Sequence, residues 1–360
     1  MHLLRIIKIS FLACLTTAAT FEIRAEKWTT PSGVIEGKIS GIYGTMAHIV
    51  GKKTMMLLPF DSLDDASLDQ VAQYLATVPA EKPWAESTSP VAKATKGRLQ
   101  ILKDGKLVAF DPGTRAEPEF YVLYFSAHWC GPCRRFTPTL VQQYNNLRNR
   151  AFGEKCEVLF VSWDKGRSEQ AEYVAEVQMP WLTVKFNADV GVLEKWKPNS
   201  IPGLAVVNRN GDIVFHSHEG GEYHGPTKPF QDLLALLREM EPTKAKYHQG
   251  RHRLAIRQQI VAGANQSVPA KVYFTPLDRK KFQGLKEPRV QIHCKVNEKG
   301  TVESFICEPA LPPAYLDQSR QEIGRWLFLP AVENGKAQPQ EVVVPVDFAA
   351  TTGADASTKS

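Results

Sequence analysis

Apolar and polar positions follow three different patterns along the chain, and each pattern predicts a different kind of unit. Between residues 33 and 59, short apolar runs alternate with small or polar residues and are separated by turn signals, as in a small β-rich domain. Between residues 97 and 240, continuous apolar runs take turns with helical periodicity, which is the order of an α/β fold. From residue 287 onward, a strand hairpin, a helix and further strands predict a small α+β unit.

The middle segment carries the strongest pattern. Its apolar runs predict buried strands at residues 120–127 and 156–164, and Asn210-Gly211 marks the turn of a later hairpin. Helical periodicity predicts helices over residues 131–148, 167–178 and 226–240, and the first of them has Phe136, Leu140, Tyr144 and Leu147 on one face. Strand, helix and strand, then hairpin and closing helix, is the order of a thioredoxin-like α/β fold.

Polar and Pro-rich breaks set the expected boundaries of a multidomain chain. The tail from residue 350 lacks large apolar residues and is expected to be disordered. The predicted organisation is a signal peptide at 1–25, a small β-barrel at 26–77, a linker at 78–96, a thioredoxin-like domain at 97–240, a linker at 241–267, an α+β domain at 268–349 and a disordered tail at 350–360.

The first residues, "MHLLRIIKISFLACLTTAATFEIRAEKW", have the pattern of an export signal. Arg5 and Lys8 are basic, residues 9–19 are apolar or small, and cleavage could follow Ala19 or Ala25. The expected location is therefore the periplasm, with an N-terminal membrane anchor as a variant. A buried helix of a cytosolic protein, or a lipoprotein acylated at a cysteine in this segment, remains as an alternative reading.

Charge and cysteine content narrow the function classes. The formal net charge is +6 over 360 residues and there is no long Lys/Arg block, so we expect no nucleic-acid partner. Six cysteines, of which the signal would remove one, are too few for a disulfide scaffold of this size.

Cys130 and Cys133, in "YFSAHWCGPCRRFTP", could bind a metal, staple the chain or exchange electrons. A structural zinc needs about four ligands, and this pair has no second C-x-x-C to complete it. A disulfide that closes so short a loop constrains little of the unfolded chain. Redox exchange fits best, because a C-x-x-C beside a βαβ pattern is typical of that chemistry. No metal or other cofactor is expected.

The expected position of the pair assigns a role to each cysteine. A cysteine between a strand and a helix has its sulfur at the helix N-terminus, where free N–H groups and the macrodipole stabilise a thiolate. Pro132 suits the first helical turn, and Arg134 and Arg135 add positive charge. Cys130 is therefore expected to attack a substrate disulfide, and the more buried Cys133 to resolve the mixed disulfide.

At these residues the chain resembles known proteins. "WCGPC" is similar to thioredoxin, and "FVSWD", "MPWL" and "NSIPGLAVVN" follow in the order of the tryparedoxin/nucleoredoxin branch. The resemblance implies that Ile201-Pro202 is a cis-proline loop beside the cysteines, whose backbone pairs with an extended substrate. An ordinary trans proline at Pro202 remains the alternative. Trp129 is expected to flank the substrate, with ordinary packing as the other reading.

Two departures from these families affect the mechanism. Thioredoxins carry a buried acid six positions before the first cysteine, where this chain has Tyr124. Asp164 is therefore a candidate for moving protons to and from Cys133, and a strand-end or helix-capping aspartate is the alternative. The tryparedoxin-like branch usually has two prolines between the cysteines, whereas this chain has Gly131-Pro132, and that dipeptide alone does not fix the direction of electron flow.

The flanking segments resemble interaction modules. "KWTTPSG" and "LLPFDSLDDASLDQV" resemble the Sla-type homology domain, an SH3-like barrel. "WLFLPA", "NGKAQ" and "VVVPVDF" resemble the C-terminal domain of TonB-family proteins. These resemblances imply an SH3-like spacer or binding module and a TonB C-terminal-like domain for docking or self-association.

The other candidate sites have simpler readings. His216, His218 and His224 could bind a metal, but a solvated loop is the stronger interpretation. If Val296 faces Thr301 in the last hairpin, Cys294 faces Glu303 and Cys307 lies about 13 Å away, too far for a disulfide unless a bulge intervenes. Cys156 is expected to be a core thiol.

The sequence therefore predicts an exported thiol–disulfide oxidoreductase that acts as a disulfide reductase. Its expected partners are protein disulfides or dithiols, an upstream dithiol donor, and a protein partner or second copy at the C-terminal domain. The alternative is a redox-inactive periplasmic binding or scaffold protein, or a TonB-like partner.

Overall fold

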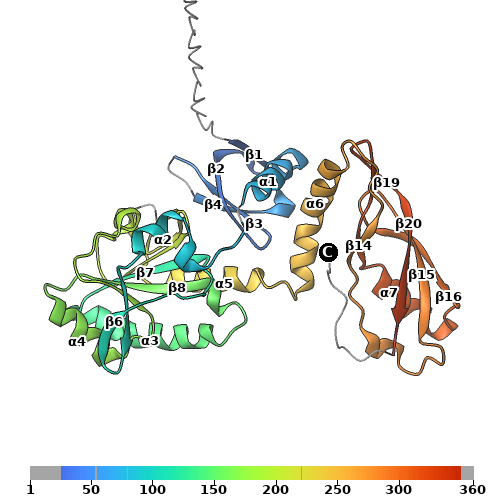
Figure 1. The fold of residues 1–360 in the computed structure, drawn as a ribbon. Helices are drawn as coiled ribbons and strands as arrows, with labels where there is room; N and C mark the ends of the chain where they lie inside the picture. Colours follow the sequence, from blue (N-terminus) through green and yellow to red (C-terminus); the bar gives the residue numbers. More distant parts are fainter. Residues whose placement is uncertain (1–25, 53–54, 79, 220, 350–360) are drawn as a thin grey trace, which may run out of the picture.

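The computed structural model describes residues 26–349, except 53–54, 79 and 220. The expected signal peptide (1–25) and disordered tail (350–360) lie outside the described residues. Figure 1 shows three folded regions, which we call the N-terminal, middle and C-terminal domains. Within this described part, no helix has the length and apolar character needed to cross a membrane.

The middle domain is built on a mixed seven-stranded sheet of order β11-β10-β7-β8-β9-β5-β6. β7, β8 and β9 are parallel to one another, and β10 is antiparallel to β7, so the predicted thioredoxin-like α/β arrangement is confirmed. Its elements are β5 (Leu99–Lys103), β6 (Lys106–Ala109), β7 (Phe120–Ser126), α3 (Gly131–Arg148), β8 (Cys156–Ser162), α4 (Arg167–Val177), β9 (Leu182–Val184), β10 (Gly203–Asn208), β11 (Ile213–His216), β12 (His218–Glu219), β13 (Glu222–Tyr223) and α5 (Thr227–Glu239).

Every residue of the central strand β7 is buried, because the sheet is covered on both faces. Val122 and Tyr124 pack into a core that includes residues of α3 and α5. Tyr121 and Leu123 point to the other face and pack into a second core. A strand that is apolar at every position is typical of this two-sided burial, and the continuous run in the sequence predicts it correctly.

The second core corrects the prediction of a flexible linker over residues 78–96. A 3-10 turn at Trp84–Glu86 and helix α2 (Pro90–Thr95) belong to the middle domain instead. The Trp84 side chain is 5% exposed and packs beside Tyr121. The Pro- and Ser-rich composition suggested a linker, but these residues provide turns and helix caps, and the apolar residues between them are buried.

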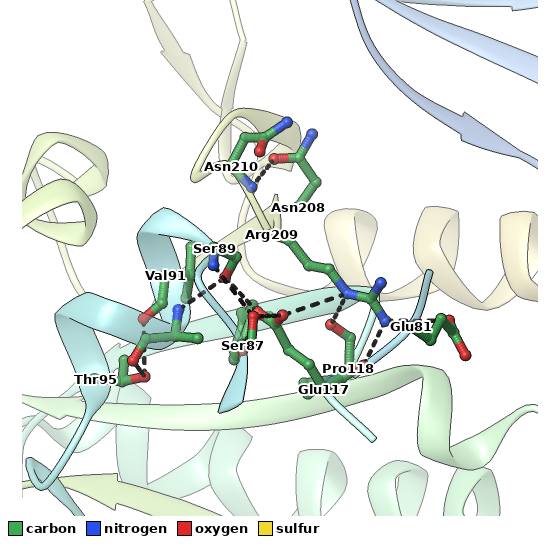
Figure 2. A network of polar contacts seen from close by, with 12 residues as sticks. Glu81, Ser87, Ser89, Val91, Thr95, Glu117, Pro118, Asn208, Arg209 and Asn210 are labelled. Carbon is green, nitrogen blue, oxygen red and sulfur yellow. Dashed lines mark hydrogen bonds and ion pairs between the residues drawn. The ribbon is translucent and has the colours of Figure 1, made fainter. Parts of the chain in front are cut away.

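A buried carboxylate fixes this segment to the sheet (Figure 2). Glu117 accepts hydrogen bonds from the hydroxyls of Ser87 and Ser89, each at 2.5 Å, and from Tyr121 at 2.8 Å. The guanidinium of Arg209 donates to the Glu117 backbone carbonyl at 2.6 Å. The polar groups of the segment therefore compensate one another in the interior.

The N-terminal domain has a four-stranded antiparallel sheet of order β1-β2-β3-β4 and one helix. Asp64 caps the helix by accepting a hydrogen bond from the Ser67 N–H. The elements are β1 (Glu26–Thr30), β2 (Gly33–Tyr43), β3 (Met46–Val50), β4 (Met55–Pro59) and α1 (Asp65–Thr77).

The N-terminal domain is fixed to the middle domain at the β10–β11 turn. The Ser40 hydroxyl donates to the Asp212 carboxylate at 2.7 Å and accepts from the Asn208 amide at 2.7 Å. The ring of Tyr43, which is buried, packs 4.6 Å from the ring of Phe120. The contact therefore combines aromatic burial with a compensated polar group.

The expected linker at 241–267 is also corrected, because it contains the 18-residue helix α6 (Ala245–Ala262). In Figure 1, α6 stands between the N-terminal domain and β14 of the C-terminal domain. Arg257 pairs with Asp69 of α1 through two hydrogen bonds of 2.7 and 2.6 Å. Leu254 is buried in the core of the N-terminal domain. A polar sequence gave little sign of this helix, because both partners that bury it are distant in the chain.

The other side of α6 contacts the C-terminal domain. His252 Nε2 lies 2.7 Å from the Phe328 carbonyl, and the Gln259 amide donates to the Pro330 carbonyl at 2.5 Å. One helix thus joins the two flanking domains through side-chain contacts on both of its sides.

The C-terminal domain contains a three-stranded sheet of order β16-β15-β20, two two-stranded sheets and helix α7. The predicted hairpin and the helix that follows it are confirmed. The elements are β14 (Lys271–Phe274), β15 (Arg289–Val296), β16 (Val302–Glu308), α7 (Leu316–Ile323), β17 (Leu327–Leu329), β18 (Ala331–Glu333), β19 (Lys336–Gln338) and β20 (Gln340–Asp347).

The predicted register of the β15–β16 hairpin is wrong. A register shift between Lys295 and Val296 pairs Cys294 with Phe305, and it pairs Cys307 with Ile292. The two cysteines are therefore diagonal neighbours on one face of the sheet rather than four residues apart. Both are buried free thiols in the structure.

Trp84→Ala tests whether residues 84–95 belong to the middle domain. Removing a buried indole should lower the free energy of unfolding by about 3–5 kcal/mol. Urea unfolding of the full chain, followed by tryptophan fluorescence and circular dichroism, measures the change. Trp129→Ala, which truncates an indole that is 59% exposed, should stay within about 0.5 kcal/mol of wild type. Equal effects of the two substitutions would contradict the assignment.

His48 should make stability fall in mild acid. Burial lowers the pKa of His48 to about 4, and the nearby Asp212 carboxylate only partly opposes this shift. The unfolded chain takes up the proton near its ordinary pKa of about 6.5, so the folded state loses stability as the pH falls from there towards 4.

Between pH 7 and pH 5 the expected loss from His48 is about 2 kcal/mol. Urea unfolding at the two pH values, compared between wild type and His48→Leu, isolates this contribution from the other titrating groups. The same pH dependence in both proteins would show that His48 does not titrate in this way.

Candidate active site

Cys130 and Cys133 lie where β7 ends and α3 begins, and they are joined as a disulfide with a Cα–Cα distance of 5.2 Å. Cys130 is the N-cap of α3, and its sulfur accepts a hydrogen bond from the Cys133 N–H at 3.2 Å. Cys133 is fully buried, whereas Cys130 retains 5% exposure. The less buried cysteine, Cys130, therefore lies at the N-terminus of α3, as the sequence predicted.

The local sequence explains this junction. The buried strand β7 ends at Ser126, and a short turn follows in which the Cys130 N–H donates to the Ala127 carbonyl. Pro132 lies in the first turn of α3, where a missing N–H is tolerated. The chain therefore changes from extended to helical at the first cysteine.

A second loop lies against the disulfide. The Ile201-Pro202 peptide bond is cis, as the resemblance implied. The Ile201 carbonyl oxygen is 3.8 Å from the Cys130 sulfur, and Ile201 and Trp163 pack against the cysteine pair. We call residues 197–202, which immediately precede β10, the Pro202 loop. The structure brings Ile201, Pro202 and both cysteines together, while their roles in substrate binding stay predictions.

Asp164 lies near the site but does not contact either sulfur. One carboxylate oxygen accepts from the His128 N–H at 2.7 Å, and the other accepts from the Ser162 hydroxyl at 2.7 Å. The Asp164 N–H returns a hydrogen bond to Ser162 Oγ at 2.9 Å. Both oxygens are thus engaged at the ends of β7 and β8. Proton transfer between Asp164 and Cys133 remains a prediction.

Charged and aromatic side chains surround the cysteine pair. Glu176 of α4 lies 2.8 Å from His128 Nε2 and 2.5 Å from the Arg134 guanidinium. The Trp129 indole is 59% exposed, and its N–H donates to the Trp163 carbonyl at 3.3 Å. A cavity of about 420 Å³ adjoins these residues and is lined by His128, Trp129, Lys165 and Glu169.

A buried hydroxyl network replaces the missing acid. The Tyr124 hydroxyl lies 2.6 Å from Thr137 Oγ1, which is also 2.5 Å from the Tyr173 hydroxyl. Thr137 donates to the Cys133 carbonyl at 2.8 Å. Burial raises the pKa of Tyr124, so this hydroxyl stays neutral. Through Thr137, the network holds the Cys133 carbonyl in the first turn of α3, and it places no charge there.

The other candidates lie outside this site or lack the donors for a metal. Among the described residues, no group of three or more His, Cys, Asp or Glu side chains is placed to hold a metal ion. Cys156 is fully buried at the opposite end of the sheet, opposite Phe120, and burial raises its pKa to about 12. The prediction of a core thiol is therefore confirmed.

Comparison with known proteins agrees with the geometry of the site. Residues 118–213 match a family model described as thioredoxin-like. This chain contains a thioredoxin-like domain. The match spans β7, the cysteine pair, the Pro202 loop and the first residue of β11.

Several relatives of the thioredoxin-like domain are nucleoredoxins. Nucleoredoxin of Danio rerio is 36% identical over 137 residues, which cover 37% of this chain and 30% of that protein. Probable nucleoredoxin 2 of Oryza sativa subsp. japonica is 37% identical over 150 residues, which cover 37% of this chain and 36% of that protein. This chain therefore spans only about a third of the length of either relative.

Solved structures of related proteins include tryparedoxin from Trypanosoma brucei, which is 32% identical with a TM-score of 0.29 over 36% of this chain and 87% of that one. A thioredoxin from Wuchereria bancrofti is 27% identical with a TM-score of 0.30 over 38% of this chain and 94% of that one. The family match and the nucleoredoxin relatives support thiol–disulfide oxidoreductase chemistry in the thioredoxin-like domain.

Sequence reasoning assigned no role to two residues near the site, Trp163 and Tyr223. Trp163 stands next to Asp164 and packs on the cysteine pair, and its place in the "FVSWD" motif was a signal that it could lie near the site. Tyr223 donates from its hydroxyl to the Pro202 carbonyl at 2.6 Å, although its surroundings in the sequence, "GGEYHG", look like a solvated loop.

Asp164→Ala should destabilise the thioredoxin-like domain. The substitution leaves the His128 N–H and the Ser162 hydroxyl without their acceptor, which should cost about 1–3 kcal/mol. The unfolding midpoint in urea measures the change. Asp164→Asn retains one acceptor oxygen and should lose less. If Asp164→Ala were as stable as wild type, the carboxylate would not hold these strand ends together.

Proposed function

We propose that this chain is an exported thiol–disulfide oxidoreductase that reduces protein disulfides through Cys130 and Cys133. One observation carries the proposal: a Cys-Gly-Pro-Cys pair lies at a helix N-terminus, with Cys130 5% exposed and Cys133 fully buried. That difference in access gives each sulfur a distinct task. The family match supports the same chemistry.

The proposed reaction begins with both cysteines reduced. The Cys130 thiolate attacks one sulfur of the substrate disulfide, forms a mixed disulfide and releases the other substrate sulfur as a thiolate, which takes up a proton. The Cys133 thiolate then attacks Cys130, and the second substrate sulfur leaves. The product is the Cys130–Cys133 disulfide. An upstream dithiol donor supplies two electrons to reduce it again.

The Pro202 loop is the proposed docking edge for the substrate chain. No hydrogen bond among the described residues uses the Ile201 N–H, and the polar contact found for the Ile201 carbonyl within them is the one to the sulfur of Cys130. An unpaired backbone segment can bind an extended chain through main-chain hydrogen bonds. The exposed Trp129 indole would contact the substrate beside the disulfide.

The flanking domains are proposed to direct this chemistry to particular partners. The resemblances to an SH3-like barrel and to a TonB C-terminal domain support docking or self-association outside the thioredoxin-like domain. The signal-like N-terminus supports export to the periplasm. A TonB transducer needs a membrane anchor and a long spacer, and folded domains occupy most of this chain, which favours the reductase.

Cys130→Ser should abolish turnover in insulin reduction with a dithiol donor, because the attacking thiolate is lost. Cys133→Ala should instead accumulate mixed disulfides through Cys130, visible on non-reducing gels after expression in the native host. The double variant, which lacks both sulfurs, is the control and should form no adducts.

Two results would count against the reductase. Unchanged insulin turnover in Cys130→Ser would place the chemistry elsewhere. An absence of adducts in Cys133→Ala, with Cys130 shown to react with an alkylating agent, would favour a redox-inactive binding or scaffold protein.

A further inference from the structure

A small hairpin, which follows the edge strand β11, contacts the Pro202 loop. Strands β12 and β13 follow β11, and β13 ends at Tyr223. The Tyr223 hydroxyl donates to the Pro202 carbonyl at 2.6 Å, yet the residue is 45% exposed. One side chain therefore both fixes the loop next to the disulfide and presents an aromatic surface to solvent.

His218 of this hairpin packs on Tyr223, and His216, the last residue of β11, packs on His218. The His218 ring lies 5.0 Å from the Tyr223 ring, and the His216 ring lies 5.5 Å from His218. The His218 N–H lies 3.0 Å from His216 Nδ1. The sequence favoured a solvated loop over a metal site for these histidines, and the structure gives His216 and His218 ring packing and a backbone contact.

Backbone hydrogen bonds anchor the hairpin beside the Pro202 loop. The Ser217 N–H donates to the Leu204 carbonyl at 2.8 Å, and the Leu204 N–H donates to the Ser217 hydroxyl at 2.7 Å. The His224 N–H donates to the Ser217 carbonyl at 2.7 Å. Leu204 is two residues from Pro202. The base of the hairpin is therefore bound to the start of β10, directly after the Pro202 loop.

Two residues, Pro202 and Ile201, connect Tyr223 to the reacting sulfur of Cys130. The Pro202 carbonyl that it binds directly follows Ile201, whose own carbonyl is 3.8 Å from the Cys130 sulfur. Burial raises the pKa of Tyr223, so its hydroxyl remains a hydrogen-bond donor across neutral pH. A shift of the loop would change how a bound chain is presented to Cys130.

We propose that Tyr223 is a positioning residue for polypeptide substrates. Its hydroxyl keeps the Pro202 loop in place, so that the Ile201 backbone can pair with an extended chain, and its exposed ring contacts that chain. A small disulfide needs only access to Cys130, so it does not depend on Tyr223. This inference rests on the proposed reductase function.

Tyr223→Phe removes the hydroxyl and keeps the ring. We expect kcat/KM for insulin to fall about fivefold, mainly through KM, which corresponds to the loss of one hydrogen bond. Reduction of dithionitrobenzoate, a small disulfide, should be unchanged, as should the unfolding midpoint. Tyr223→Leu also removes the aromatic ring and should lower kcat/KM for insulin further.

Tyr315→Phe is the matched control, because the Tyr315 hydroxyl also donates to a backbone carbonyl, that of Gln283 in the C-terminal domain, at 2.9 Å. Tyr315→Phe should leave kcat/KM unchanged for both insulin and dithionitrobenzoate. Unchanged insulin kinetics in Tyr223→Phe, or equal losses with both substrates, would overturn the inference. A wild-type protein that reduces neither substrate would instead refute the proposed reductase function, and this inference with it.

Discussion

Complete burial of β7 is the constraint on which the rest of the structure depends. A strand with no exposed residue needs apolar cover on both faces. On one face α3 and α5 supply it, and on the other the segment around Trp84 does. The same strand ends at the cysteine junction and begins near the Glu117 network. The requirement to cover β7 therefore also fixes the start of α3, where the chemistry is proposed to occur.

The sequence allowed the middle domain and the cysteine pair to be predicted, because both depend on local patterns. A continuous apolar run specifies a buried strand, and a Cys-Gly-Pro-Cys motif before a helical pattern specifies where the sulfurs lie. Neither prediction needed knowledge of a distant partner.

The remaining features depend on partners that are far apart in the chain. Helix α6 has no clear apolar face in the sequence, and its side chains contact Asp69, Phe328 and Pro330, which lie up to 188 residues away. The register of the β15–β16 hairpin differs from the prediction because Val296 pairs with Val302 rather than Thr301. An irregularity between Lys295 and Val296 then shifts the remaining pairs by one more residue. Tyr223 gave no sequence signal, since a tyrosine in a glycine-rich segment has no periodicity.

Strand β10 separates the Pro202 loop from the contact with the N-terminal domain. Its first residue, Gly203, follows the Pro202 loop, and its last residue, Asn208, contacts Ser40 of the N-terminal domain. Five residue steps of about 3.3 Å place these ends about 17 Å apart. The N-terminal domain is thus attached at the end of β10 that lies away from the Pro202 loop. If the flanking domains hold a partner, its disulfide meets Cys130 at a high effective concentration, so the thioredoxin-like domain needs little affinity of its own.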